Sequence, residues 1–559
     1  MAALDFPSSP TVGQVYTANG KSWQWDGVSW ISYNTLIAAG SNTQIQFNNS
    51  GAFGASAGLT WNGTTLTTTG LNNTGNTTLG DAAGDTLTIN AGVISIPNGQ
   101  IATTAASQAE MEAGTEAALR SMSPLRVRQA IIAVTGAASA ANDIGVAGGA
   151  GFGVGICPGP LPAGVTPVSN GTFSPYSPDY GNYQFTDDSV MVWVPAFYYK
   201  WGTGSNGLGV NVIDVKAYSA YADVATANAA GYALHRAFYD GGAVKAGFFV
   251  DKFQCSNNGG VASSIKMGNP LSSSSAHNPF SGLTGTPTNA YHGALVAAKT
   301  RGAQFFCNSR FIHAALALLS YAHAQASSST TYCAWYGSTT NYPKGNNNNA
   351  LRDTNDTSVI WVSDGYSNAG KTGSAGYAGG AGNVFAKSTH NGQNCGVADL
   401  NGNMWEINLG MTSDGTNLYI MNTAVAMKDV TSGTTLATDA WGATGIAAMY
   451  SSLGTTYESL TKANGWVLFG SSNQVLVEAT SGNGWALTGA GLPKSGGTGG
   501  SNAFGQDGNY QPAAWPNELC PLSGGYWGHG SNAGVWAFFL ADVRGSSNVV
   551  VGFRSASYL

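Results

Sequence analysis

Three oxygen-bearing side chains lie close together in the string Val397-Ala-Asp-Leu-Asn-Gly-Asn-Met-Trp-Glu406 of this chain. Asp399, Asn401 and Glu406 carry the carboxylate and amide oxygens that calcium prefers. The string does not contain the complete ligand set of a calcium loop, so a calcium site is only one interpretation. The alternative is a structural role. Asn401-Gly402 would then make a turn, Asn403 and Glu406 would satisfy backbone groups beside it, and Trp405 would pack under a sheet.

The other residue types that carry chemistry are scattered along the chain. The cysteines form no Cys-x-x-Cys pair and no zinc-type group with histidine. Their even number permits disulfides, but wide spacing favours buried free thiols at Cys157, Cys255, Cys307, Cys333, Cys395 and Cys520. The 28 acidic residues contain no paired motif of the kind a polysaccharide hydrolase needs. Because folding can assemble such a pair, a depolymerase stays open as an alternative.

A second string, Gly552-Phe-Arg554, lies near the C-terminus. Together the two strings resemble the signature of the C-type-lectin-like fold, and most closely its sulfatase-modifying, formylglycine-generating branch. That branch carries Asp-hydrophobic-x-Gly-Asn-Val-Trp-Glu followed by Gly-Phe-Arg. The resemblance implies a scaffold that displays a variable binding face, whose core loops are held by Asp399, Asn401, Gly402, Asn403, Trp405, Glu406, Gly552, Phe553 and Arg554.

The enzymes of this superfamily need residues that the chain lacks. The oxidases use a reactive cysteine pair near the C-terminus, whereas residues 524–559 contain no cysteine and Cys520 stands alone. The sulfoxide-forming relatives use a His-x-x-x-His-x-Glu iron site. His313 and His323 are too far apart to share one helical turn, and no glutamate follows them. We therefore expect no catalytic residue, no resident metal and no cofactor other than the calcium alternative.

The tract from Gly524 to Asn548 resembles the Gly-Gly-x-Trp…Ala-Gly-Val region of lectin-like phage receptor-binding proteins. The closing Gly-Phe-Arg strand returns to the core, so this tract is expected to cross the exposed end of the sheet. We expect Trp527 and Val535 to be core residues. Side chains that stack on sugars or act as hot spots are expected on a receptor-binding face, with a core position as the alternative: Tyr526, His529, Asn532, Trp536, Phe538, Phe539, Asp542 and Arg544.

Composition limits the class of protein. Charged residues make up 9% of the 559 residues, against about 25% in ordinary globular proteins, and glycine numbers 78. Such a chain, rich in small polar residues, resembles extracellular or virion β-structures. The net charge of −6 gives no electrostatic footprint for nucleic acid. No signal peptide and no apolar stretch long enough to span a bilayer are visible, so we expect no membrane insertion.

Residues 1–34 are predicted to form a module of their own. Asp26-Gly27 lies between aromatic runs, which is a strong hairpin signal, and the tryptophans can supply a small core. The string resembles an N-terminal module of bacteriophage tail fibres that sits at the attachment end. The residues to which this resemblance gives virion attachment are Trp23, Trp25, Asp26, Gly27 and Trp30.

Residues 35–100 are predicted to form a repetitive β-shaft. Segments such as 44–51 and 59–66 alternate apolar with polar residues and stop at Gly or Asn. One chain has too few apolar residues per strand for a core, so a trimeric β-prism is favoured over a flexible linker. Residues 101–142 resemble the helical segment of tail fibres, with Ser123-Pro124 as a helix start, and are expected to form a collar.

Residues 143–559 are predicted to form one α+β C-type-lectin-like domain. We expect buried strands at 191–200 and 247–256, an amphipathic helix at 309–324 and loops over 332–387. The fold class is therefore multidomain and β-rich, with a hairpin module, a trimeric prism shaft, a helical collar and a lectin-like domain.

These observations predict a homotrimeric bacteriophage tail fibre, made in the cytoplasm of the bacterial host and located in the virion. Its N-terminus would contact tail or baseplate proteins, and its C-terminal domain a glycan or protein receptor on the bacterial surface. The alternatives are a baseplate or collar protein that binds another virion protein, and a depolymerase of host polysaccharide.

Overall fold

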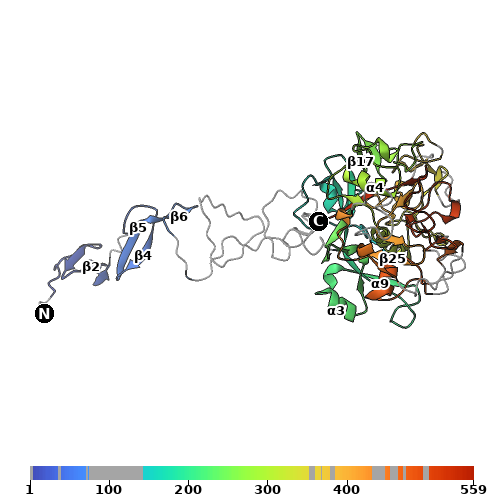
Figure 1. Cartoon of the computed structure of the whole chain (residues 1–559). Helices are drawn as coiled ribbons and strands as arrows, with labels where there is room; N and C mark the ends of the chain where they lie inside the picture. Colours follow the sequence, from blue (N-terminus) through green and yellow to red (C-terminus); the bar gives the residue numbers. More distant parts are fainter. Residues whose placement is uncertain are drawn as a thin grey trace. The chain divides into compact units, whose positions relative to one another are not determined.

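The computed structural model describes residues 4–34, 39–70, 74, 143–351, 359–366, 368–377, 384–430, 447–453, 464–469, 474–494, 503–505 and 507–559. The chain divides into two compact units, Met1–Gln100 and Ile101–Leu559, and is β-rich with several sheets (Figure 1). The predicted helical segment 101–142 lies outside the described residues, as does nearly all of the predicted shaft beyond residue 70. Among the described helices, none combines the length and the apolar character needed to cross a membrane.

The N-terminal unit begins with a three-stranded antiparallel meander. Its strands are β1 (Val15–Ala18), β2 (Lys21–Trp25) and β3 (Trp30–Tyr33). The predicted hairpin is the β2–β3 connection. Asp26 Oδ1 accepts the backbone N–H groups of Val28 and Ser29 at 2.8 and 2.7 Å, and Gly27 has a φ of 105°. Both residues of the Asp-Gly pair therefore shape the turn.

An aromatic core holds this meander together. The ring of Phe6 lies 5.1 Å from Tyr16, 5.5 Å from Trp23 and 5.2 Å from Trp30. Trp25 is the cross-strand partner of Trp30, and their rings lie 5.7 Å apart. The predicted tryptophan core is confirmed, with Phe6 as a central member that the sequence pattern did not indicate.

A second meander follows in the same unit. Its strands are β4 (Gln44–Asn49), β5 (Ala52–Trp61) and β6 (Leu66–Thr68). Asn62 makes the β5–β6 turn, because its Oδ1 accepts the N–H groups of Thr64 and Thr65 at 3.0 and 2.7 Å. Four large apolar side chains of this sheet remain between 44% and 55% exposed: Phe47, Phe53, Trp61 and Leu66. One copy of the sheet therefore leaves much of its apolar surface uncovered.

Two six-stranded sheets lie at the centre of the large unit. The first is antiparallel, in the order β18-β32-β15-β9-β8-β7. Its strands are β7 (Thr166–Pro167), β8 (Asn182–Gln184), β9 (Val190–Pro195), β15 (Gly247–Asp251), β18 (Phe306–Cys307) and β32 (Ser555–Tyr558). β15 is the strand predicted at 247–256. The strand predicted at 191–200 is divided, because after β9 the chain enters another sheet as β10 (Phe197–Trp201).

The second sheet has the order β27-β28-β30-β29-β23-β31. Its strands are β23 (Trp405–Ile407), β27 (Gly465–Leu468), β28 (Gly508–Gln511), β29 (Leu522–Ser523), β30 (Phe538–Phe539) and β31 (Val551–Gly552). Only Phe553 and Arg554 separate β31 from β32 of the first sheet. The C-terminal segment thus contributes a strand to both sheets.

Helix α5 (Arg310–Ala326) is the helix predicted at 309–324, and Ser309 caps it by accepting the N–H of Ile312 at 3.2 Å. The expected amphipathic character is wrong, because every residue from Arg310 to Ala324 is buried. Its polar side chains find partners inside the protein. His313 Nε2, for example, lies 3.0 Å from the carbonyl oxygen of Val535. Apart from its last two residues, the helix is therefore an element of the core.

Smaller elements surround these sheets, and β17 lies against α4 (Figure 1). The helices are α3 (Val224–Ala229), α4 (Tyr291–Lys299), α6 (Val384–Lys387) and α9 (Gly482–Gly489). The short strands are β11 (Ile213–Ala217), β12 (Ala233–Leu234), β13 (Tyr239–Asp240), β14 (Ala243–Val244), β16 (Ser256–Asn258), β17 (Val261–Ser263), β19 (Asn346–Asn347), β20 (Ala350–Leu351), β21 (Val359–Ile360), β22 (Gly376–Tyr377), β24 (Met411–Ser413), β25 (Leu418–Met421) and β26 (Tyr450–Ser452). All six cysteines are buried and free, as the sequence predicted.

Candidate recognition site

The two sequence motifs meet at a buried ion pair between Glu406 and Arg554. Strand β23 pairs in parallel with β31, which brings Glu406 opposite Gly552. Arg554 then donates from Nη2 to Glu406 Oε1 at 2.6 Å and from Nε to Oε2 at 2.7 Å, and neither side chain is more than 1% exposed. Burial acts to lower the pKa of Arg554, but the carboxylate of Glu406 raises it above its ordinary value. This bidentate pair fixes the C-terminal segment to strand β23 of the second sheet.

The other motif residues are also held inside the protein. Asp399 Oδ2 accepts from the backbone of Gly373 at 2.7 Å and from Thr372 Oγ1 at 3.0 Å, and burial raises the pKa of Asp399 to about 6. Asn403 Oδ1 accepts the N–H of Gly370 at 2.9 Å. Gly402 has a φ of 133°, and a Cβ there would collide with the Asn346 backbone. These bonds support the structural interpretation of the motif.

The calcium interpretation conflicts with this geometry at one ligand. Both oxygens of Glu406 already accept hydrogen bonds from Arg554. The Asn401 side chain is buried, and neither its amide nitrogen nor its oxygen has a hydrogen-bond partner among the described residues. Within the described ranges, no three His, Cys, Asp or Glu residues are grouped so that they can hold a metal.

Register divides the second sheet into an inner and an outer face. Cross-strand partners share a face, and alternate residues of one strand point to opposite faces. Glu406, Ser523 and Phe538 are connected by cross-strand pairing and form the inner face. Arg310 packs against them, with Nη1 donating to Ser523 Oγ at 2.6 Å and the guanidinium 4.6 Å from the Phe538 ring centroid. The inner face is therefore part of the core.

The outer face carries a row of aromatic side chains on neighbouring strands. Trp466, Tyr510 and Phe539 are successive cross-strand partners on β27, β28 and β30. The rings of Trp466 and Tyr510 lie 5.8 Å apart, and those of Tyr510 and Phe539 lie 4.6 Å apart and are stacked. All three are half-buried, whereas Trp405, whose ring lies 6.1 Å from that of Phe539, is 4% exposed. We call Trp405, Trp466, Tyr510 and Phe539 the aromatic row.

The loop after β29 lies against this row. His529 contacts Trp405 and Trp466 with ring centroids 4.9 and 5.3 Å away, and Tyr526 lies 4.5 Å from His529. Burial lowers the pKa of His529 to about 4, so the imidazole is neutral at neutral pH. Its Nδ1 has no hydrogen-bond partner within the described part of the chain. Nδ1 itself is buried, whereas the His529 ring as a whole is half-buried beside aromatic rings, a setting that suits a ligand with apolar surface.

A polar pocket of about 240 Å³ occupies the other end of the outer face. Its floor is apolar and includes Ile407, Leu522 and Val551, which lie on the same face as the aromatic row. Asp542 is in its wall, and burial raises the pKa of this carboxyl group. The other polar wall residues are Ser546, Ser547 and Asn548.

The structure corrects part of the predicted receptor-binding set. Tyr526, His529, Phe539 and Asp542 lie on the outer face described above. The expected surface position is wrong for Trp536, Phe538 and Arg544, which are at most 3% exposed. Trp536 packs 5.3 Å from Phe504 and 5.4 Å from Phe469, and the Arg544 guanidinium lies 4.8 Å from the Tyr291 ring. Asn532 is half-exposed in a 3₁₀ turn, and the core positions expected for Trp527 and Val535 are confirmed.

The sequence pattern missed Trp466 and Tyr510. Both belong to four-residue strands in which one large aromatic alternates with smaller neighbours, a signal that is too short to separate from loops.

No family model matches the sequence, and no curated protein matches it either.

Proposed function

We propose that this protein is a bacteriophage tail fibre or receptor-binding protein whose large unit adsorbs to the host cell surface. The observation that carries the proposal is the outer face of the second sheet, where half-buried aromatics adjoin a polar pocket. Tyrosine, tryptophan and histidine in such a position are typical of recognition surfaces. The buried Glu406–Arg554 pair supports the resemblance to the C-type-lectin-like scaffold, because it joins the two motifs on which that resemblance rests.

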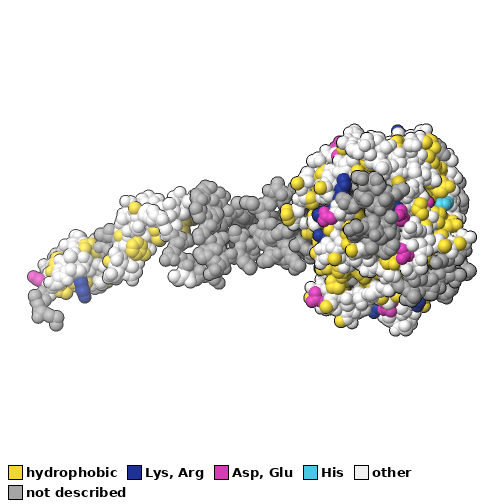
Figure 2. Space-filling model, in the orientation of Figure 1, with side chains coloured by type: hydrophobic (Ala, Val, Ile, Leu, Met, Phe, Trp, Pro, Cys, Tyr) yellow, Lys and Arg dark blue, Asp and Glu magenta, His cyan; other side chains and the backbone are white. Residues whose placement is uncertain are grey.

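The large unit has a surface suited to non-covalent recognition through shape, amides and hydroxyls. Charged side chains are sparse on the face shown in Figure 2. We propose binding without catalysis, since a glycosidase needs two carboxyl groups flanking its substrate and, among the described residues, Asp542 is the one carboxylate that lines the outer-face pocket. Avidity from several copies would compensate for weak single sites.

The N-terminal unit is proposed to supply virion attachment and trimerisation. Val12 and Val28 are 75% and 87% exposed beside the Asp26-Gly27 turn, while the aromatic rings hold the module together. The exposed valines would meet a tail or baseplate protein. The uncovered apolar residues of the β4–β6 sheet would meet two further copies of the same sheet.

Binding of the labelled full-length protein to a panel of bacterial strains tests the function. Trp466→Ala and Phe539→Ala are expected to weaken adsorption by about 1–3 kcal/mol, as for other aromatic hot spots. Tyr176→Ala is the matched control, because Tyr176 is an aromatic residue that is 76% exposed and whose ring lies 6.4 Å from that of Tyr332, which is not part of the aromatic row. Row variants that bind cells as well as the wild type would refute the assignment of the face.

The same preparation separates the alternative functions. Binding to isolated tails without binding to host cells would support the baseplate or collar function. Release of reducing sugar from host polysaccharide would support the depolymerase.

Trimerisation and attachment have tests of their own. Mass measurement of the full-length protein should give three copies, and a stable monomer would contradict the shaft. Deletion of residues 1–34 should leave a trimer that still binds cells but does not enter particles. Normal incorporation of this deletion variant would show that attachment resides elsewhere.

A further inference from the structure

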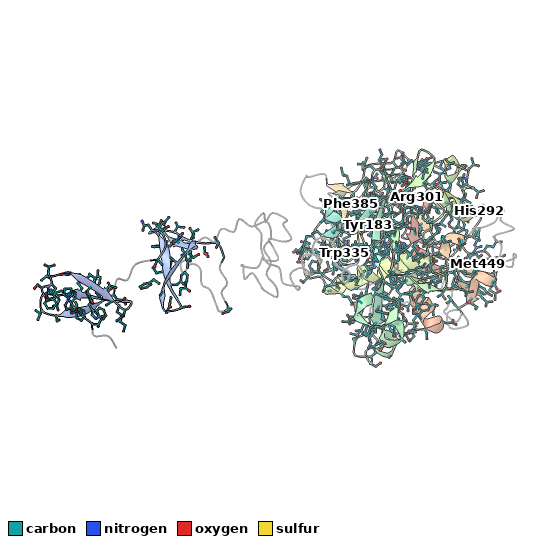
Figure 3. The ribbon with its side chains drawn as sticks, turned by 90° about the vertical axis from the view of Figure 1, so that its left-hand side faces the viewer. Tyr183, His292, Arg301, Trp335, Phe385 and Met449 are labelled. Carbon is teal, nitrogen blue, oxygen red and sulfur yellow. The ribbon has the colours of Figure 1, made fainter. Side chains whose placement is uncertain are left out.

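A second cavity, of about 390 Å³, lies beside the first six-stranded sheet. Its wall is formed by the ends of β8 and β9, the residues after β15, helix α6 and the loop that follows it. Phe385 of α6 is labelled near the margin of the large unit in Figure 3. The residues that line the cavity are Val168, Pro178, Asp179, Asn182, Val190, Lys252, Phe253, Lys266, Phe385 and Asn394.

Lys252 is the unusual group in this wall. Its side chain belongs to a residue that is only 6% exposed, and its ammonium donates to Asn182 Oδ1 and to the carbonyl oxygen of Asn394. A lysine ammonium has three donors, so two neutral acceptors leave one N–H available. Within the described ranges no carboxylate forms an ion pair with it, whereas the buried Arg301 pairs with two carboxylates and the buried Arg554 with one. Lys252 is therefore a buried cation without a direct ion pair, and the Asp179 carboxylate in the same wall acts on it only through its charge.

A second ammonium group shares the cavity. The Nζ atoms of Lys266 and Lys252 lie 5.0 and 5.7 Å from the ring centroid of Phe385. Burial lowers the pKa of Lys252 to about 8, with the charge of Lys266 acting in the same direction and Cys395 and Asp179 opposing it. A bound anion opposes both effects, because its negative charge stabilises both ammonium groups.

The remaining wall residues restrict the anion. Asp179 contributes a carboxylate whose Oδ2 accepts from Ser169 Oγ at 2.7 Å. Two lysines and one aspartate leave a net charge of +1, which matches a monoanion better than a doubly charged phosphate. The cavity is larger than a carboxylate alone requires. Phe385 offers an aromatic face, and Asp179 offers an acceptor for a hydroxyl group.

We propose that this cavity binds a carboxylate-bearing sugar, with its carboxylate between Lys252 and Lys266 and its ring against Phe385. This site is distinct from the aromatic row and gives the protein a second point of contact with an acidic glycan. The choice of a sugar over a simple carboxylic acid rests on the proposed function, while the anion site itself does not.

Ligand-observed NMR and calorimetry of the full-length protein with sodium D-glucuronate test the proposal. We expect D-glucuronate to bind with a dissociation constant on the order of 1 mM, D-glucose not to bind, and acetate to bind more weakly. Lys266→Met, at an exposed position, should weaken glucuronate binding at least tenfold. Lys216→Met is the matched control, because it removes the same charge from an exposed ion pair with Asp214.

Lys252→Met separates a ligand role from a structural one. It should abolish glucuronate binding in a protein that still unfolds cooperatively, with a modest fall in melting temperature because Asn182 Oδ1 and the Asn394 carbonyl lose their donor. The proposal is overturned if glucuronate does not bind, if Lys266→Met leaves binding unchanged, or if glucose binds equally well. Equal affinity for acetate would overturn the assignment of a sugar as the ligand and would show a plain carboxylate site. Because no cells are used, each of these failures is distinguishable from a failure of the adsorption assay.

Discussion

Phe538 and Phe539 are neighbours in one short strand, yet they lie on opposite faces of the second sheet. Phe538 is fully buried beside Arg310, on the face that also carries the Glu406–Arg554 pair. Phe539 is half-buried and stacked on Tyr510. In this sheet a structural residue and a candidate recognition residue differ by one position. The unit of function is therefore a face of the sheet, and a whole segment of sequence contains residues of both kinds.

The largest expected effect comes from breaking the inner face at its ion pair. Glu406→Ala leaves Arg554 buried without its carboxylate, and removal of one partner of a buried pair costs about 3–5 kcal/mol of unfolding free energy. Urea unfolding of the full-length variant measures this loss. Asp429→Ala is the control, because both side chains of the Lys428–Asp429 pair are more than half exposed. We expect little change in the unfolding free energy of this variant. A stable Glu406→Ala protein would show that the inner face does not depend on the pair.

The matched variants Phe538→Ala and Phe539→Ala compare the two faces directly. Phe538→Ala should cost about 3–5 kcal/mol, as for other fully buried aromatics. Phe539→Ala should cost less than half as much, because part of its ring already contacts solvent. Thermal unfolding and cell adsorption are measured on both proteins. The assignment of faces is reversed if Phe539→Ala melts early while Phe538→Ala melts normally and loses adsorption.

The smallest effect concerns the pH dependence of two histidines, His313 at the inner face and His529 at the outer face. Burial lowers the pKa of both, well below the ordinary value for His313 and to about 4 for His529. Because the unfolded chain takes up these protons first, stability is fully present above about pH 6.5 and is lost as the pH falls towards the folded-state pKa. Asp399, whose pKa burial raises to about 6, acts in the opposite direction below that pH.

Denaturation midpoints at about pH 7 and pH 5 test this sign. The wild type should lose stability on acidification, and His529→Gln and His313→Gln should each lose less by similar amounts, because pH 5 lies above the folded-state pKa of both histidines. An equal pH dependence in all three proteins would place the acid-sensitive groups outside this sheet.

Several parts of the fold were predictable from local sequence. The Asp26-Gly27 hairpin, the strand β15, the position of helix α5 and the free cysteines all follow from short-range signals. The burial of the motif residues around Asn401-Gly402 also agrees with the prediction. The amphipathic character predicted for α5 does not agree with the structure, because its polar side chains, such as His313, find partners in distant segments.

The receptor-binding set was only partly predictable. Trp536, Phe538 and Arg544 have the residue types of a recognition surface but lie inside, while Trp466 and Tyr510 belong to the outer face and gave no signal. Strands of two to four residues are too short for alternation to indicate which face is covered.

The sequence by itself determined where turns, caps and apolar runs occur, because these depend on backbone preferences and on neighbours a few residues away. It also determined that charge is scarce, so each buried charge needs a specific partner. The tertiary structure decided which partners those are. Arg554 meets Glu406 across 148 residues of chain, whereas Lys252 donates to the amide oxygen of Asn182 and the carbonyl oxygen of Asn394. Burial depends on which strands and helices cover a side chain, and that is set by long-range packing that no local pattern records.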